Sequence, residues 1–155
     1  MRFSRKPSFA SQLGAAIGKG ILAGVVGTAA ITLSQMIEMR ITGRESSDAP
    51  VKAADEVLGV KPKTPEQKEL LSQEMHWAYG TAWGIARGLI SLTGLKGLPA
   101  SLLHLGAVWG TSMIMLPALK AAPPVTEETP EEVGVDGLHH AIYAVTTGIV
   151  YDAMK

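Results

Sequence analysis

The chain has 155 residues, of which 46% are hydrophobic, and its 14 basic and 14 acidic residues give a formal net charge of zero. A neutral chain without a concentrated basic face is not suited to binding nucleic acid. The absence of cysteine excludes disulfides, thiolate nucleophiles and thiolate-bound clusters.

Charged residues are missing from long stretches of the chain. None lies in residues 20–37, 97–119 or 137–151, and residues 75–95 contain one, Arg87. Apolar stretches of about 20 residues match the hydrocarbon thickness of a bilayer. The 17 glycines agree with this, because glycine lets membrane helices approach closely. We expect an all-α membrane protein, one domain over residues 1–155, with four transmembrane helices at about 20–41, 75–95, 100–119 and 137–154.

The first predicted helix covers about residues 13–41. Its basic start and apolar run are similar to a signal peptide, but Lys19 interrupts the run and the charge-free part continues to Ile37. A signal peptide has a shorter apolar region of about 7 to 15 residues. We interpret the segment as a retained first span, with Lys19 reaching the interface through its long side chain.

A polar loop is predicted at residues 42–74, and it contains two helix starts. Ser47-Asp48-Ala49-Pro50 supplies capping and first-turn residues, and apolar residues recur after it at helical spacing. This predicts a short helix on the membrane surface. Thr64-Pro65-Glu66-Gln67 is typical of a capping box with proline in the first turn. A helix should therefore begin there and continue without a break into the second span.

The third and fourth spans follow a tight turn predicted at residues 94–99. Pro123 and Pro124 end the third helix, and a second polar loop at residues 120–136 is acidic. The fourth helix is expected from about Gly137, and its charge-free part is short, about 22 Å at 1.5 Å per residue. Four spans put both termini on one side. We expect the cytoplasmic side, because the acidic loop and the long first loop then share the outer face.

Three short motifs occur twice, in the same order. Their order predicts two repeated helical hairpins. The matched motifs are Gly27-Thr28 with Gly110-Thr111, Thr64-Pro65-Glu66-Gln67 with Thr129-Pro130-Glu131-Glu132, and His76-x-x-Tyr79-Gly80-x-x-x-Gly84 with His140-x-x-Tyr143-Ala144-x-x-x-Gly148.

Small residues recur at four-residue spacing on the predicted spans. In lipid, helices associate through close packing and interhelical hydrogen bonds. The pattern predicts packing within the bundle first, since a four-helix chain must bury its own seams, and contacts in a homo-oligomer or a larger membrane complex as the alternative. The predicted packing residues are Gly20, Gly24, Gly80, Gly84, Gly88, Gly106, Gly110 and Gly148.

Arg87 is an ionisable residue deep inside the second predicted span. It shares a helix face with His76 and lies about 16 Å further along the helix. A charged residue at this depth is costly and faces a partner or water. His104, Tyr151 and Asp152 are the candidates at the same depth. We interpret Arg87 and Asp152 as a structural pair, with a small-solute or proton pathway centred on Arg87 as the alternative.

The histidines form a second constellation. His76 and His140 occupy matching places in the two halves, and His139 and Glu38 belong to the same membrane face. Rings at helix ends favour the interface, so anchoring or helix–helix hydrogen bonding is the main interpretation. The alternatives are ligation of haem b by His76 and His140, a metal ion held with Glu38 and His139, and proton transfer.

No pattern in the chain is typical of an enzyme. It contains no pairing of nucleophile and base, no metalloprotease spacing and no phosphate-binding loop, because its glycine-rich tracts lie inside apolar helices. We therefore expect neither catalytic residues nor a resident cofactor.

The segment Leu116-Pro117-Ala-Leu-Lys-Ala-Ala-Pro123-Pro124-Val125, followed by an acidic stretch and by His139-His140, resembles the YagU-like family of small, uncharacterised bacterial inner-membrane proteins. The run Ile21-Leu-Ala-Gly24-Val-Val and the histidine-led helix with Tyr79 are similar to it as well. The resemblance implies a multi-pass inner-membrane location and supplies no catalytic or ligand-binding residue. We expect a structural or accessory membrane protein whose immediate partner is the lipid bilayer.

Overall fold

The computed structural model describes residues 7–154. In this part of the chain there are five helices and no strand, which confirms the all-α expectation. The helices are α1 (Phe9–Thr42), α2 (Ala49–Leu58), α3 (Pro65–Ser91), α4 (Gly97–Ala118) and α5 (Pro130–Ala153).

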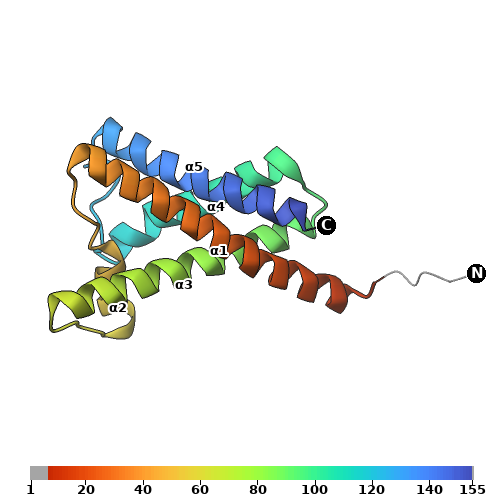
Figure 1. The fold of residues 1–155 in the computed structure, drawn as a ribbon, viewed down its shortest axis with the longest axis horizontal. Helices are drawn as coiled ribbons and strands as arrows, with labels where there is room; N and C mark the ends of the chain where they lie inside the picture. Colours follow the sequence, from red (N-terminus) through yellow and green to blue (C-terminus); the bar gives the residue numbers. More distant parts are fainter. Residues whose placement is uncertain (1–6, 155) are drawn as a thin grey trace, which may run out of the picture.

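Four long helices form an elongated bundle, and α2 packs beside the start of α3 (Figure 1). The first turns of α1 and the last turns of α5 lie at the same end of the bundle, which we name the terminal end (Figure 1). The start of α5 and the end of α1 lie at the opposite end, named the loop end. The first and last helices of the described chain therefore begin and end on the same side of the bundle.

Local capping chemistry sets the helix starts. Thr64 accepts a hydrogen bond from the amide of Gln67 at 3.3 Å, so α3 begins where the capping pattern predicted and runs without a break to Ser91. The short helix predicted in the first loop is confirmed as α2. The predicted start of the last helix was too late, because α5 begins at Pro130 rather than at about Gly137. Thr129 and Glu132 form a complete capping box there.

Two helices are long and apolar enough to cross a membrane. The best windows of α1 and α4 have mean hydropathies of 1.7 and 1.2. Among the described residues, α3 and α5 do not meet the same measure, so length and composition support two of the four predicted spans. A signal sequence or the core helix of a soluble protein also passes this test. Burial is therefore the more informative property.

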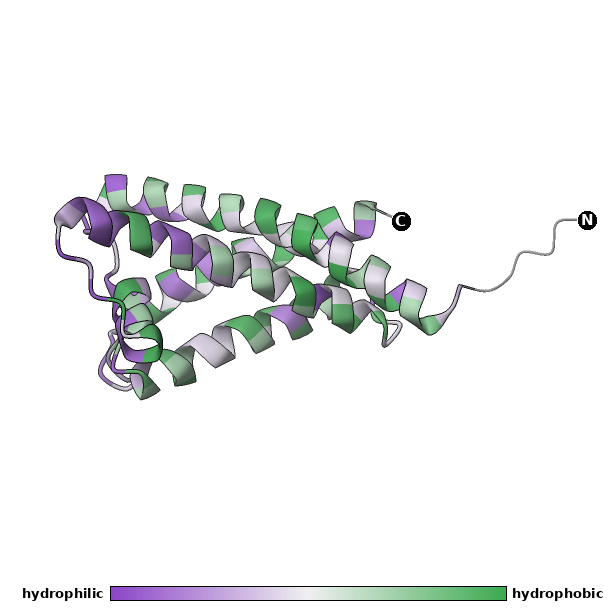
Figure 2. Ribbon diagram, turned by 90° about the horizontal axis from the view of Figure 1, so that it is seen from below, coloured by the Kyte–Doolittle hydropathy of each residue, from purple (hydrophilic) through white to green (hydrophobic). Residues whose placement is uncertain are grey.

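The interior of the bundle combines a small apolar cluster, formed by Ile31, Val108, Tyr143 and Ala144, with buried polar side chains, and many large apolar side chains are exposed. The four largest fully buried side chains are those of Arg87, His104, Thr28 and Thr147. In contrast, 74% of Ile114 is exposed. Figure 2 shows that hydrophobic residues recur along the helices, with strongly hydrophilic segments at the loop end. Fully buried ionisable side chains together with many exposed large apolar ones are uncommon in a protein folded in water.

Helices α1 and α3 run antiparallel and meet through small residues. A Cβ atom added to Gly20 would lie 2.5 Å from the carbonyl oxygen of Gly84, and one added to Gly24 would lie 2.8 Å from that of Thr81. Gly88 likewise faces the backbone of Ala16. The backbones thus approach as closely as glycine permits. Five predicted packing residues lie in this contact: Gly20, Gly24, Gly80, Gly84 and Gly88.

The predicted packing residues outside α1 and α3 behave differently from one another. Gly148 faces the side chain of Ser101, so it packs α5 against α4. The expectation that Gly106 and Gly110 pack within the bundle is wrong, because no atom of another element lies within 4 Å of a Cβ added to either. Helix α4 turns His104 and Val108 inward, and the two glycines fall on its other side.

Candidate functional site

Arg87 is the fully buried charged residue of the described bundle, with none of its side chain exposed. Its Nη2 atom lies 3.2 Å from Oδ2 of Asp152, and its guanidinium carbon lies 4.7 Å from the centre of the Tyr151 ring. The angles do not suit a hydrogen bond, so Nε, Nη1 and Nη2 have no hydrogen-bond partner among the described residues. The predicted pairing of Arg87 with Asp152 is thus an ion pair that leaves most of the donor capacity unused.

Asp152 connects three helices at the terminal end. Its Oδ2 atom accepts a hydrogen bond from the amide of Gly97 at 2.9 Å, at the start of α4, and it also faces Arg87 of α3. Beside it, the hydroxyl of Tyr151 lies 2.6 Å from Oγ of Ser91. Both contacts come from the last turn of α5. The site therefore joins α3, α4 and α5 where the chain turns and ends.

His104 reaches the same interior from α4, but it does not bind Arg87. Its Nε2 atom lies 2.9 Å from the carbonyl oxygen of Trp83, one turn before Arg87 on α3. A carbonyl oxygen can only accept, so Nε2 carries the proton and Nδ1 of the neutral ring is an acceptor. Nδ1 has no partner in the described structure. His104 also lies against Tyr143, with ring centres 5.5 Å apart.

Tyr143 and Thr147 complete this interior from α5. The hydroxyl of Tyr143 donates to the carbonyl oxygen of Gly80 at 2.5 Å and so binds α5 to α3. Thr147 is one turn further along α5, and its hydroxyl lies against Gly27 of α1. Sequence reasoning identified Tyr143 as part of a repeated motif and missed Thr147. Their four-residue spacing on one helix face was the available signal.

The structure does not bring His76 and His140 into a shared contact. Nε2 of His76 lies 3.1 Å from Oγ1 of Thr32 on α1, whereas Nδ1 of His140 lies 2.9 Å from the carbonyl oxygen of Asp136 in its own helix. Within residues 7–154, no hydrogen bond or ring contact joins the two histidines. Each imidazole bonds to its own surroundings, which is helix–helix bonding for His76 and local bonding for His140.

Glu38 and His139 lie near each other at the loop end. Nε2 of His139 is 3.9 Å from Oε2 of Glu38, and its Nδ1 is 2.8 Å from Oγ of Ser34. However, Glu38 accepts hydrogen bonds from Arg44 at 2.7 and 3.1 Å, and these bonds raise the pKa of Arg44. No group of three metal-binding side chains is present in the described part of the chain. The geometry therefore suits an ion pair with an attached histidine better than a metal centre.

A further clamp at the loop end was not predicted from the sequence. Nε1 of Trp109 on α4 donates to Oδ2 of Asp136 on α5 at 2.8 Å. A Cβ atom on Gly137 would lie 2.9 Å from Cζ2 of the indole, so the glycine makes room for the ring. Burial raises the pKa of Asp136, but the bonds from His140 and Trp109 outweigh it and leave that pKa below its usual value. A buried indole N–H needs a partner, and this was the missed signal.

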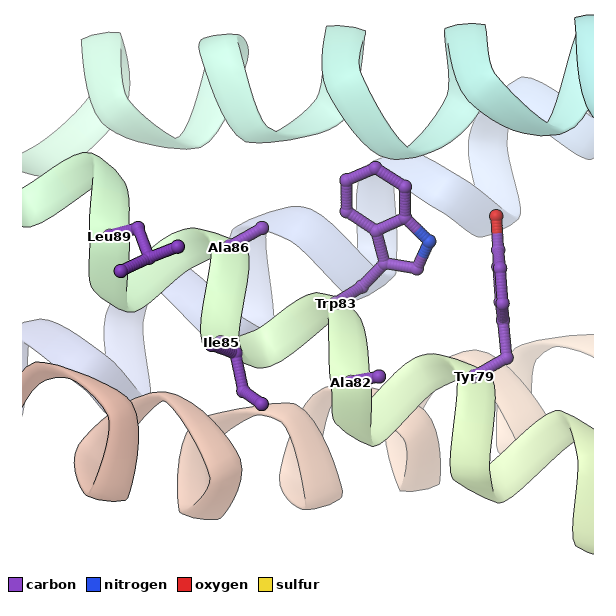
Figure 3. A pocket seen from close by; sticks show the side chains of 6 residues that line it. All are labelled: Tyr79, Ala82, Trp83, Ile85, Ala86 and Leu89. Atoms are coloured by element: carbon purple, nitrogen blue, oxygen red, sulfur yellow. The ribbon is translucent and has the colours of Figure 1, made fainter.

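An open apolar groove of about 380 Å³ lies on one side of α3. Trp83 and Tyr79 point from α3 toward α4, while Ile85 points toward α1 (Figure 3). The two aromatic rings meet edge to face, with centres 6.1 Å apart. The lining brings together no nucleophile with a base. The other residues along the groove are Ala82, Ala86 and Leu89.

The buried polar side chains are thus the most distinctive chemical feature of the molecule. Comparison with protein-family models, with curated proteins and with solved structures found no match to this chain.

Proposed function

We propose that this chain is a multi-pass membrane protein of structural or accessory type, in which α1, α3, α4 and α5 each cross the bilayer. The observation that supports it is the inverted distribution of side chains, with Arg87 and His104 fully buried and large apolar side chains facing outward. Such a surface is stable against lipid tails, where polar groups must find partners inside the protein. In water the same large apolar side chains would be exposed to solvent.

The direction of the side chains explains why α3 and α5 have low mean hydropathy. Their polar residues face the interior, as Arg87 does on α3 and His139 and Thr147 do on α5. Their outward positions are apolar, since 45% of Leu89 and 66% of Ile149 are exposed. When a helix has an apolar face toward lipid and a polar face toward the interior, its mean hydropathy is only moderate. The average therefore underestimates how well these helices suit a membrane.

The arrangement also favours the predicted topology. With both terminal segments at one end, we place them in the cytoplasm of a bacterium and the protein in its inner membrane, in line with the resemblance to the YagU-like family. The pairs α1 with α3 and α4 with α5 are the two hairpins of the proposed repeat. Thr64 and Thr129 cap the second helix of each pair.

A structural role follows from the way the polar groups are used. Tyr143, His104 and His76 each bond to another helix, and the small-residue contact between α1 and α3 leaves no opening between those two backbones. These groups hold helices together. We therefore favour a structural or accessory task over catalysis, and over the cofactor alternative based on His76 and His140.

Reporter fusions test the proposed topology. A reporter active in the cytoplasm should give a signal when fused after Thr93 or Lys155, and a periplasmic reporter should give one after Ser46 or Thr126. Equal signals after Thr93 and Thr126 would show that α4 does not cross and would overturn the four-span arrangement. A periplasmic signal after Lys155, with the alternation kept, would reverse the orientation alone.

A further inference from the structure

Five buried polar atoms without hydrogen-bond partners gather in the terminal half of the bundle. They are Nε, Nη1 and Nη2 of Arg87, Nδ1 of His104 and Oγ1 of Thr147. None of these three side chains is exposed. A buried polar atom without a partner costs about 1 to 3 kcal/mol, and more when it is charged. Five such atoms on three helices indicate that a bound polar species forms hydrogen bonds with them.

Arg87, His104 and Thr147 come from α3, α4 and α5, and their contacts place them near one another, with the hydroxyl of Thr147 also against Gly27 of α1. His104 bonds to the carbonyl oxygen of Trp83, one helical turn before Arg87. Thr147 lies beside the hydroxyl of Tyr143, without the geometry of a hydrogen bond, and the Tyr143 ring in turn lies against His104.

The next residue of α5, Gly148, makes room for polar groups. A Cβ atom there would lie 3.7 Å from Nε of Arg87 and would collide with Oγ of Ser101. The missing side chain leaves both polar groups directed at the same place. Ser101 is itself buried, so this place belongs to the protein interior.

The donors and acceptors in this space require a particular kind of guest. Arg87 can only donate, whereas Nδ1 of His104 can only accept, because Nε2 holds the proton for Trp83. A group that bridges them must accept and donate at once. Halide and carboxylate ions cannot donate to His104, and a metal cation is repelled by Arg87. Water meets both requirements and is neutral, which suits a site where Asp152 already balances the charge of Arg87.

The two ends of this group of polar side chains differ in exposure and in hydrogen bonding. Asp152 is 20% exposed at the terminal end and touches Arg87. Toward the loop end, Tyr143 gives its proton to the carbonyl oxygen of Gly80, and Thr28 gives its own to that of Gly24. A hydroxyl that donates to a backbone carbonyl passes no hydrogen bond onward. The protons of these two hydroxyls are therefore held by backbone carbonyls, while the buried hydroxyl of Tyr79, near Tyr143, has no partner among the described residues.

We propose that Arg87, His104 and Thr147 hold a small cluster of bound water that enters beside Asp152 and ends at Tyr143. The inference rests on the proposed four-span fold, and it makes the site a closed pocket for water within the membrane. It also replaces the idea of a solute or proton pathway through Arg87, because a closed pocket conducts nothing across the bilayer. The water supplies the hydrogen bonds that the ion pair with Asp152 leaves unmade.

Water-edited solid-state NMR of the ¹⁵N-labelled full chain in phospholipid vesicles tests the site. Magnetisation should pass from water to Nε of Arg87 and to the ring of His104, with Arg87→Lys used to assign the arginine signal. Thr147→Val should weaken the transfer to His104, because it removes a hydroxyl that binds the cluster. Thr146→Val is the matched control and should leave the transfer unchanged. Absence of transfer to Arg87 in the wild-type protein would overturn the proposal.

Two further measurements on the same vesicles test whether the bound species is water and whether the site is closed at Tyr143. Adding bromide should leave the Arg87 signal in place, and a saturable shift would show an anion site instead of water. Osmotic water permeability should equal that of protein-free vesicles, and an increase would overturn the closed end at Tyr143. Loss of water at Arg87 in a protein with the alternating reporter pattern would reject this inference and leave the four-span proposal standing.

Discussion

Nη2 of Arg87 and Oδ2 of Asp152 lie 3.2 Å apart, one side chain fully buried and the other at the edge of the bundle. Asp152 also accepts the amide of Gly97, so one carboxylate holds the end of α5 to both α3 and α4. Removing one partner of such a pair leaves a buried charge without compensation. A single substitution that removes one charge should therefore destabilise the protein more than a double substitution that removes both charges.

Asp152→Asn should lower the free energy of unfolding by about 3 to 5 kcal/mol, because it leaves the Arg87 charge buried and unpaired. The double variant Arg87→Met with Asp152→Asn should recover most of this loss, since neither charge is left. Thermal unfolding in detergent, read by circular dichroism, measures both. If the single variant were as stable as the wild type, the ion pair would have no structural role.

Gly84→Ala should disrupt the contact between α1 and α3. Its Cβ atom would lie 2.5 Å from Cα of Gly24, so a backbone has to move, at a cost of about 1 to 3 kcal/mol. Gly106→Ala is the matched control on α4, because no atom of another element lies within 4 Å of a Cβ added to Gly106. Alanine has a better helix propensity than glycine, so this variant should be as stable as the wild type or more stable. Equal loss of stability in both variants would contradict the assigned contact.

A larger substitution at the same position tests the other role predicted for the α4 glycines. If Gly106 and Gly110 form an interface between copies of the chain, Gly106→Leu should shift the protein in lipid nanodiscs to a smaller oligomer without unfolding it. The mass of the particles by light scattering is the measurement. A monomer in the wild-type protein would reject the homo-oligomer.

The purified chain should lack a Soret band, also after incubation with haem b, because Nε2 of His76 is already bonded to Thr32 and, within the described residues, no ring contact joins His76 to His140. Absorption spectra after removal of free haem make the test. A Soret band that His76→Ala and His140→Ala both abolish would restore the cofactor interpretation.

The capping box of α5 should open in acid. The amide of Thr129 donates to Glu132 at 2.7 Å, and this bond, together with that from the Thr129 hydroxyl, holds the pKa of Glu132 below its usual value of 4.5. Because the folded pKa is the lower one, the stabilisation is complete above about pH 4.5 and is lost as the pH falls through the lowered pKa. Carbon chemical shifts of residues 130–136 during titration should follow this loss. Glu132→Gln should remove the transition, and a transition that persists would assign it to another carboxyl group.

Local chemistry made much of the fold predictable. Thr64 caps α3 because a threonine, a proline and a glutamine at fixed spacing satisfy the first amides of a helix whatever surrounds it. The same reasoning at Thr129 predicts the start of α5, but the absence of charge was used to place that start and put it near Gly137. Acidic residues belong in a first turn, where the helix dipole favours them.

Tertiary relationships were less predictable. The depth of Arg87 within its span suggested Asp152 as a partner, because the lengths of the helices fix depth. The spacing of Gly106 and Gly110 resembles that of Gly20 and Gly24, yet spacing does not tell which side of a helix meets a neighbour. For the same reason the repeated histidines found different partners: a threonine from another helix for His76, and the preceding turn for His140.

The central claim is that the bundle turns its apolar surface to lipid, and α5 tests it most directly because its charge-free part, residues 137–151, is short for a membrane span while Ile149 is 66% exposed. The chain has no cysteine, so a single nitroxide label at Ile149→Cys reports on one outward position. In vesicles, its relaxation should respond strongly to oxygen and weakly to a water-soluble nickel complex, and a label at Thr126→Cys should show the opposite. Strong relaxation by nickel at position 149 would place α5 in water and contradict the account.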